Sequence, residues 1–127
     1  MSKPTEEGVD GRRCVLVVED EMFIAFELEA ALIDGGFRVL GPVGSVKDAL
    51  DLLKNERPDA AVLDVNLAGE NVAPVALQLR VLGVPFVLAT ASDSAELARN
   101  AVFADVRNLG KPTNLKHLVD TVWALKA

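Results

Sequence analysis

The sequence contains few of the residues that build disulfide frameworks, large aromatic cores or basic surfaces. Its 127 residues include one cysteine, one tryptophan, one histidine and no tyrosine, and the formal net charge is −6 at pH 7. A single cysteine excludes an internal disulfide and a multi-cysteine metal site, and Cys14 lies in an apolar run that is typical of a buried strand. The negative charge disfavours unaided binding to nucleic acid or to an anionic membrane, and it favours a cation site.

Long apolar segments are also lacking. No stretch approaches the ~18 consecutive apolar residues of a membrane span, and the first residues lack the apolar centre of a signal peptide. We therefore expect a cytoplasmic protein that does not bind membranes. Residues 1–11 are polar and contain glycine and proline, which predicts a flexible lead-in before one folded domain over residues 12–127. We expect no separate output domain, because a chain of this length supports a single hydrophobic core.

Half of the residues are apolar, and they form short β-branched runs that alternate with segments of helical periodicity. We expect strands at residues 14–18, 37–43, 60–63, 84–89 and 105–109. We expect helices at residues 22–34, 46–55, 72–82, 94–103 and from 115 onward. Strands and helices that alternate in this way predict a doubly wound α/β fold, in which a five-stranded parallel sheet is covered by helices on both faces.

Polar residues follow four of the five predicted strands. They are Glu19 and Asp20 after the first strand, Asp64 after the third, Thr90 after the fourth and Lys111 after the fifth. In a doubly wound sheet, ligands bind beyond the carboxyl ends of the strands. We therefore expect these five side chains to meet at one edge of the sheet.

The residue types at this edge are suited to phosphoryl transfer. Three carboxylates about 4 Å apart would repel one another by roughly 4 kcal/mol per pair at an effective dielectric constant near 20, so a cation is needed among them. Mg²⁺ binds one or two carboxylates, keeps several waters and accepts a phosphate oxygen. An ammonium at Lys111 and a hydroxyl at Thr90 are suited to further phosphoryl oxygens, which leaves Asp64 as the nucleophile.

The motifs at these strand ends resemble those of the response-regulator receiver domains, the CheY-like family. The order and spacing fit from Cys14 to the C-terminus, and the matching pieces are Val17–Glu21 (VVEDE), Asp64 with Leu67 and Gly69 after it, Ala89–Ala91 (ATA) and Gly110–Thr113 (GKPT). The resemblance implies a flavodoxin-like (βα)5 fold with the strand order 2-1-3-4-5, counted along the chain. It also implies a cis peptide bond between Lys111 and Pro112.

The resemblance further implies a role for each residue of the site. Asp64 is the expected phosphoacceptor, while Thr90 and Lys111 are expected to contact phosphoryl oxygens. The expected Mg²⁺ ligands are the side chains of Glu19, Asp20 and Asp64 and the backbone carbonyl of Asn66.

Membership of this family would imply a function in a two-component or phosphorelay system. The expected phosphodonor is a histidine kinase or a histidine phosphotransfer protein, and the chain is expected to act as a stand-alone switch or relay, not as an enzyme. The expected state is a monomer, or a weak homodimer through the face formed by the fourth helix, the fifth strand and the fifth helix. No direct contact with nucleic acid is expected.

Three departures from the family pattern bear on the expected mechanism. Glu19 stands where the family more often has aspartate, and its longer side chain can reach a metal through a water. Asn108 stands three residues before Lys111, where the family usually has an aromatic switch residue. The run Pro85–Thr90 and the missing aromatic are similar to a receiver subgroup, often found in alphaproteobacteria, that has Phe-Ala-Thr and a remodelled fourth helix. After Thr90, the polar residues Ser92, Asp93 and Ser94 predict a mobile loop that orders on phosphorylation.

Three other classes of protein fit the sequence less well than a receiver does. An enzyme of the haloacid-dehalogenase type would need a second acid two residues after Asp64, where this chain has Asn66, and a longer chain. A pseudo-receiver would keep the fold as an interaction module without taking a phosphoryl group, and Asn108 is compatible with that alternative. A DNA-binding regulator is disfavoured, because the chain is acidic and has no helix-turn-helix pattern.

Overall fold

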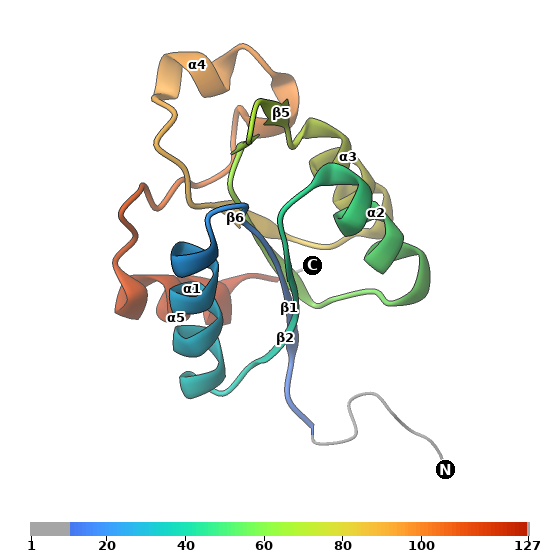
Figure 1. Ribbon diagram of the computed structural model, residues 1–127, viewed down its shortest axis with the longest axis vertical. Helices are drawn as coiled ribbons and strands as arrows, with labels where there is room; N and C mark the ends of the chain where they lie inside the picture. Colours follow the sequence, from blue (N-terminus) through green and yellow to red (C-terminus); the bar gives the residue numbers. More distant parts are fainter. Residues whose placement is uncertain (1–10, 127) are drawn as a thin grey trace.

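A central parallel sheet with helices on both faces forms the body of the protein (Figure 1). The computed structural model describes residues 11–126, so the predicted lead-in lies outside the described residues except for Gly11. Four strands form the sheet in the order β2-β1-β3-β6, which is the predicted order for the first four strands of the chain. Their bounds are β1 (Cys14–Val18), β2 (Arg38–Val43), β3 (Ala60–Leu63) and β6 (Phe86–Leu88).

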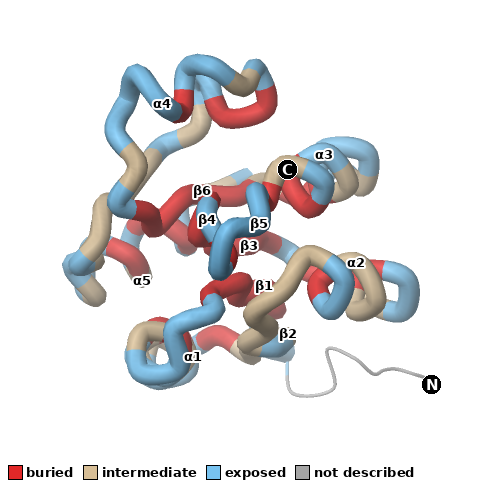
Figure 2. Tube along the Cα trace, turned by 45° about the horizontal axis from the view of Figure 1, so that its top comes forward, coloured by how far each residue is buried: buried red, intermediate tan, exposed pale blue. Residues whose placement is uncertain are grey.

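The helices cover both faces of the sheet, as Figure 2 shows. They are α1 (Met22–Asp34), α2 (Val46–Asn55), α3 (Ala73–Leu82), α4 (Ser94–Ala98), the short 3₁₀ helix η1 (Ala101–Phe103) and α5 (Leu115–Ala124). The helices α1 and α5 pack on one face, whereas α2, α3, α4 and η1 contribute to the core on the other. No helix among residues 11–126 is long and apolar enough to cross a membrane.

The two faces of the sheet follow from the alternation of side chains along each strand. In β1, Val15 and Val17 face α1 and α5, while Leu16 and Val18 face α2 and α3. All five residues of β1 are buried, which explains why the strand is a continuous apolar run instead of an apolar–polar alternation. The polar residues of the central strands are therefore confined to the strand ends.

The parallel sheet has four strands, so the prediction of a fifth strand was wrong. Instead of a strand at residues 105–109, the structure has one isolated parallel bridge between Leu88 and Asn108. Two backbone hydrogen bonds, Leu88 N to Arg107 O and Leu109 N to Leu88 O, flank this bridge. The pairing does not continue, because the next donor, the N–H of Thr90, is bonded to the side chain of Asn108.

Two other segments differ from the prediction. The helix expected at residues 94–103 is divided into α4 and η1, because the side chain of Asn100 accepts a hydrogen bond from Val102 N and replaces a helical backbone bond there. The predicted loop 65–71 contains a short hairpin formed by β4 (Asn66–Leu67) and β5 (Glu70–Asn71). Its two turn residues, Ala68 and Gly69, both have positive φ angles, 50° and 89°, as a type I′ turn requires.

The helices α1 and α5 meet closely at the end of α1. A Cβ atom on Gly35 would lie 2.6 Å from a methyl group of Val119, so the absence of a side chain at this position allows the close approach. The indole N–H of Trp123 donates a hydrogen bond to the carbonyl of Gly35 at 3.0 Å, and its ring lies 4.4 Å from the ring of Phe37. The tryptophan thus packs against the end of α1 and the start of β2.

Candidate functional site

The pairing of three strands places the predicted acidic residues in one row. Val18 pairs with Leu63, and the ladder extends past it because Asp64 N donates to Val18 O at 2.9 Å. Glu19 and Asp64 therefore follow directly at the ends of adjacent strands, and Asp20 comes next. Carboxylate oxygens of these three acids lie within 4.8 Å of one another. The structure thus brings together all three predicted acids.

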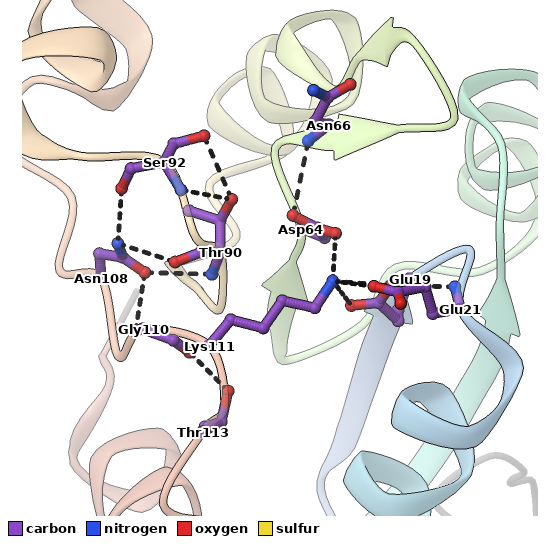
Figure 3. A network of polar contacts seen from close by, with 10 residues as sticks. All are labelled: Glu19, Glu21, Asp64, Asn66, Thr90, Ser92, Asn108, Gly110, Lys111 and Thr113. Carbon is purple, nitrogen blue, oxygen red and sulfur yellow. Dashed lines mark hydrogen bonds and ion pairs between the residues drawn. The ribbon is translucent and has the colours of Figure 1, made fainter.

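The ammonium of Lys111 lies among the carboxylates of Glu19, Glu21 and Asp64 (Figure 3). Its Nζ lies 2.9 Å from Asp64 Oδ2, 2.7 Å from Glu21 Oε1 and 3.2 Å from Glu19 Oε1. The side chains of Glu19 and Asp64 are only 1% and 5% exposed, so these pairs are shielded from water and are stronger than surface ion pairs. The lysine comes from the segment after the Leu88–Asn108 bridge, and the peptide bond that follows it, Lys111–Pro112, is cis as predicted.

The surroundings of Glu19 and Lys111 raise the pKa values of these two residues of the cluster. Burial raises the pKa of Glu19 above its ordinary value, and the neighbouring charge of Asp64 acts in the same direction. Burial alone would lower the pKa of Lys111, but its hydrogen bonds to Glu21, Asp64 and Glu19 outweigh this effect and raise the pKa. Lys111 is therefore a permanent cation in a cluster that still carries net negative charge.

An open pocket of about 450 Å³ lies above the buried carboxylates. Five of the six predicted site residues line it: Asp20, Asp64, Asn66, Thr90 and Lys111. The sixth, Glu19, lies beneath the pocket and is 3% exposed. The structure therefore collects all the predicted residues at one site that opens to solvent.

The donor set fits a hard divalent cation. All three acids offer oxygen ligands, which Mg²⁺ prefers, and Asp20 is exposed on the open side of the cluster. Within residues 11–126, the buried Oε1 of Glu19 accepts no hydrogen bond, although Lys111 lies near it, so this oxygen retains a lone pair for a further positive partner. The acidic cluster can therefore hold a metal ion, with the pocket above it free for additional oxygen ligands.

The opposite side of the pocket is organised by a network that the sequence did not predict. Thr90 N donates to Asn108 Oδ1 at 3.2 Å, and the hydroxyl of Thr90 contacts the N–H and Oγ of Ser92 at 3.3 and 3.4 Å (Figure 3). Asn108 Oδ1 also accepts from Gly110 N at 2.9 Å, which is an Asx turn. An asparagine two residues before a glycine at a strand end was a detectable signal for that turn. No feature of the sequence indicates the bond to Thr90.

Comparisons with known proteins agree with this geometry. The sequence profile of the family described as "Response regulator receiver domain" matches residues 15–123. Response regulator MprA of Mycobacterium sp. (strain KMS) is 35% identical over 114 residues, which cover 87% of this chain and 49% of MprA. The chain spans about half the length of the curated relatives it matches.

Solved structures show the same fold. The solution structure of the BeF₃-activated conformation of SdrG from Pseudomonas melonis Fr1 is 35% identical, with a TM-score of 0.73 and coverage of 90% of this chain and 96% of SdrG. The receiver domain of PhyR from Erythrobacter litoralis aligns with a TM-score of 0.79 over 91% of this chain and 90% of that domain, at 23% identity. The chain therefore belongs to the response regulator receiver domain family, whose members act in two-component signal transduction.

Proposed function

We propose that this chain is a phosphoacceptor receiver that takes a phosphoryl group on Asp64 and works as a switch or relay, not as an enzyme. The observation that carries the proposal is the position of the Asp64 carboxylate. It is nearly buried, lines an open pocket, and has a lysine ammonium at 2.9 Å and two further acids beside it. A carboxylate that only capped a helix would need none of these neighbours.

Asp64 is suited to the nucleophilic role because one of its oxygens has no strong hydrogen-bond partner among the described residues. Oδ2 is held by Lys111, whereas Oδ1 has only a long contact of 3.5 Å from Asn66 N. In the transfer, an oxygen of Asp64 forms a bond to phosphorus while the bond from phosphorus to the donor's histidine nitrogen breaks, and the imidazole leaves with that electron pair. Lys111 stays close enough to neutralise one phosphoryl oxygen, and the hydroxyl of Thr90 lies across the same pocket to donate to another.

Mg²⁺ is the proposed cofactor. Glu19, Asp20 and Asp64 would hold it with their carboxylates, and the backbone carbonyl of Asn66 is the proposed fourth protein ligand. When bound, the ion supplies positive charge that neutralises the acids and a phosphoryl oxygen. The longer side chain of Glu19 is compatible with contact through a water.

The proposed partners are a histidine kinase, a histidine phosphotransfer protein, or both, in the cytoplasm. Receipt of a phosphoryl group requires a donor histidine to approach Asp64, and the pocket is open on that side. We further propose a stand-alone receiver that is a monomer or a weak homodimer through the face of α4, the segment 105–109 and α5. The run Pro85–Thr90, Asn108 in place of the aromatic and the split fourth helix support placement in the Phe-Ala-Thr subgroup.

The test is an amide NMR titration with Mg²⁺ followed by beryllium fluoride, which mimics a phosphoryl group on aspartate. The relative SdrG was solved in a BeF₃-activated conformation, so the same reagent is the natural probe here. We expect saturable shifts at the amides of Asp64, Thr90 and Lys111 in the wild type and none in Asp64→Asn. A wild type that binds Mg²⁺ without responding to beryllium fluoride or to acetyl phosphate would instead favour a phosphorylation-independent interaction module.

A further inference from the structure

One side chain joins the two segments that carry the phosphoryl-contacting groups. Asn108 Oδ1 accepts hydrogen bonds from Thr90 N at 3.2 Å and from Gly110 N at 2.9 Å. Asn108 Nδ2 donates to Thr90 O at 3.3 Å and to Ser92 O at 3.4 Å. A carboxamide has two acceptor sites and two N–H donors, so all four are used here.

These bonds replace a connection that the backbone does not make. The parallel pairing between β6 and the following segment is limited to the Leu88–Asn108 bridge, so Thr90 lies beyond the end of the ladder. Its N–H and its carbonyl are both bonded to the Asn108 side chain, which therefore fixes the peptide groups on either side of the Thr90 α-carbon. The position of the Thr90 hydroxyl in the pocket consequently depends on Asn108.

The same side chain also fixes the approach to Lys111. Gly110, the residue before Lys111, has a φ angle of +83°, which lets the chain turn so that its N–H meets Asn108 Oδ1. Thr113 supports this turn by donating its hydroxyl hydrogen to Gly110 O at 2.7 Å. The backbone of Thr90 and the backbone of Gly110, which precedes Lys111, are thus both hydrogen-bonded to the Asn108 carboxamide.

We propose that Asn108 is a positioning residue that couples Thr90 to Lys111, so that the segments 90–92 and 110–111 respond together when Asp64 carries a phosphoryl group. This inference rests on the proposed function. In the present structure the Thr90 hydroxyl donates to Ser92 Oγ at 3.4 Å, and donation to a phosphoryl oxygen requires that bond to break. The bond from Asn108 Nδ2 to Ser92 O then keeps Ser92 connected to the segments 90–92 and 110–111, which we call the coupled unit.

The coupled unit has a direct connection to α4. Ser92 precedes Asp93, whose side chain caps this helix by accepting a hydrogen bond from Glu96 N at 2.8 Å. A displacement of the segment 90–92 therefore changes the geometry at the start of α4 within two residues. Glu96 lines the same pocket as Thr90, so this end of the helix faces the phosphorylation site.

Two substitutions separate the contributions of the carboxamide. Asn108→Asp preserves the size and the acceptor but replaces the two N–H donors with an oxygen that repels the carbonyls of Thr90 and Ser92. Asn108→Leu removes all four bonds while keeping the same number and branching of side-chain heavy atoms. Asn55→Asp is the matched control, because Asn55 makes only an exposed 3.4 Å bond to Asp51 O within α2.

The experiment measures Mg²⁺ affinity, beryllium fluoride affinity and amide shifts in each protein. We expect Asn108→Asp and Asn108→Leu to bind Mg²⁺ as the wild type does, within about twofold, and to lose about tenfold in beryllium fluoride affinity. A variant that merely unfolded would lose both affinities. We also expect the shifts at residues 90–92 to become small while those at Asp64 persist, with Asn55→Asp unchanged.

Wild-type beryllium fluoride affinity and wild-type shifts in Asn108→Asp would overturn the inference while leaving the proposed function intact. If both variants fail to fold, the wild type alone provides the test. Beryllium fluoride should then shift the NMR signals of the Asn108 side-chain amide, and unchanged signals would overturn the proposed coupling. A wild type that does not respond to beryllium fluoride contradicts the proposed function itself, and the inference falls with it.

Discussion

Lys111 Nζ and Asp64 Oδ2 lie 2.9 Å apart, although 47 positions separate the two residues in the sequence. The same ammonium also contacts Glu19 and Glu21, so one lysine side chain, 14% exposed, serves three carboxylates. Because like charges at these distances repel by a few kcal/mol per pair, the fold depends on this cation wherever no metal ion is bound. The stability of the protein and the proposed binding of Mg²⁺ are therefore linked through one small cluster.

Replacement of Lys111 by glutamine should destabilise the protein in EDTA. Removal of the ammonium leaves buried carboxylates without their partner, and we expect a loss of about 2–4 kcal/mol in the free energy of unfolding. Addition of Mg²⁺ should restore part of this loss. The measurement is urea denaturation with and without Mg²⁺.

Lys116→Gln is the matched control for that prediction. Lys116 forms an exposed ion pair with Asp120 at 3.0 Å, and such pairs contribute about 0–1 kcal/mol. Equal losses in the two variants would contradict the view that Lys111 is a buried structural cation.

Glu19→Gln should raise stability in EDTA and weaken the response to Mg²⁺. Burial raises the pKa of Glu19, so the ionised form is the disfavoured one in the folded state, and a neutral amide removes that cost. We expect a gain in stability without metal, because Lys111 keeps the carboxylates of Asp64 and Glu21 as partners. Mg²⁺ should then stabilise the variant less than the wild type, because ligand-induced stabilisation depends on affinity.

Thermal unfolding over a series of Mg²⁺ concentrations measures both effects. Glu27→Gln, at an exposed position of α1, is the control with the same change in charge. Stabilisation by Mg²⁺ that is as large in Glu19→Gln as in the wild type would argue against Glu19 as part of the metal site.

The sequence sufficed to predict the site because the site lies where strands end. Once Val18 and Leu63 are adjacent in a parallel sheet, the residues that follow them must be neighbours, so Glu19 and Asp64 could be placed together without coordinates. The beginnings of helices are also decided by local residues: the side chains of Ser45 and Asn114 each accept a capping hydrogen bond, as these residue types commonly do at a helix N-terminus.

The errors lie where side chains replace backbone bonds. A fifth strand at 105–109 agreed with the apolar pattern, but the bond from Thr90 N to Asn108 ends the ladder after one bridge. The helix 94–103 was divided by a similar competition at Asn100. The β4–β5 hairpin depends on a positive φ at Ala68, which an alanine in the sequence does not indicate. Such choices are decided by tertiary contacts and not by local propensity.

Thr90→Val should lower beryllium fluoride affinity without changing Mg²⁺ affinity. Valine preserves the shape of this buried residue but removes the hydroxyl, which is the group available to a phosphoryl oxygen. We expect a loss of about three- to tenfold, as for one hydrogen bond to a charged acceptor. Thr90→Ser retains the hydroxyl and should remain within about twofold of the wild type. Equal affinities in the valine and serine variants would exclude a role for the hydroxyl.

Cys14 should make stability fall with pH above 9. Burial raises the pKa of its thiol to about 12 from an ordinary value of 9.0, so the folded state keeps a proton that the unfolded state releases. With fewer protons bound in the unfolded state, the free energy of unfolding falls as pH rises, by at most ~1.4 kcal/mol per pH unit. The window from pH 9 to 10 lies below the ordinary pKa of lysine, which limits the contribution of Lys111.

The measurement compares the free energies of unfolding of the wild type and Cys14→Ala by urea denaturation between about pH 8 and about pH 10. This range spans the ordinary pKa of a thiol. We expect the wild type to lose stability relative to Cys14→Ala over that window. Parallel curves would show that the thiol does not titrate differently in the two states.

The most direct test of the central claim is intact-mass analysis after incubation with acetyl phosphate and Mg²⁺. The account predicts that the wild type gains the mass of one phosphoryl group, that EDTA prevents the gain, and that the adduct survives acid but is lost in base, as an acyl phosphate should be. Asp64→Asn should gain nothing. Modification of Asp64→Asn to the same extent, or a wild type that stays unmodified while Mg²⁺ is bound, would contradict the assignment of Asp64 as the phosphoacceptor.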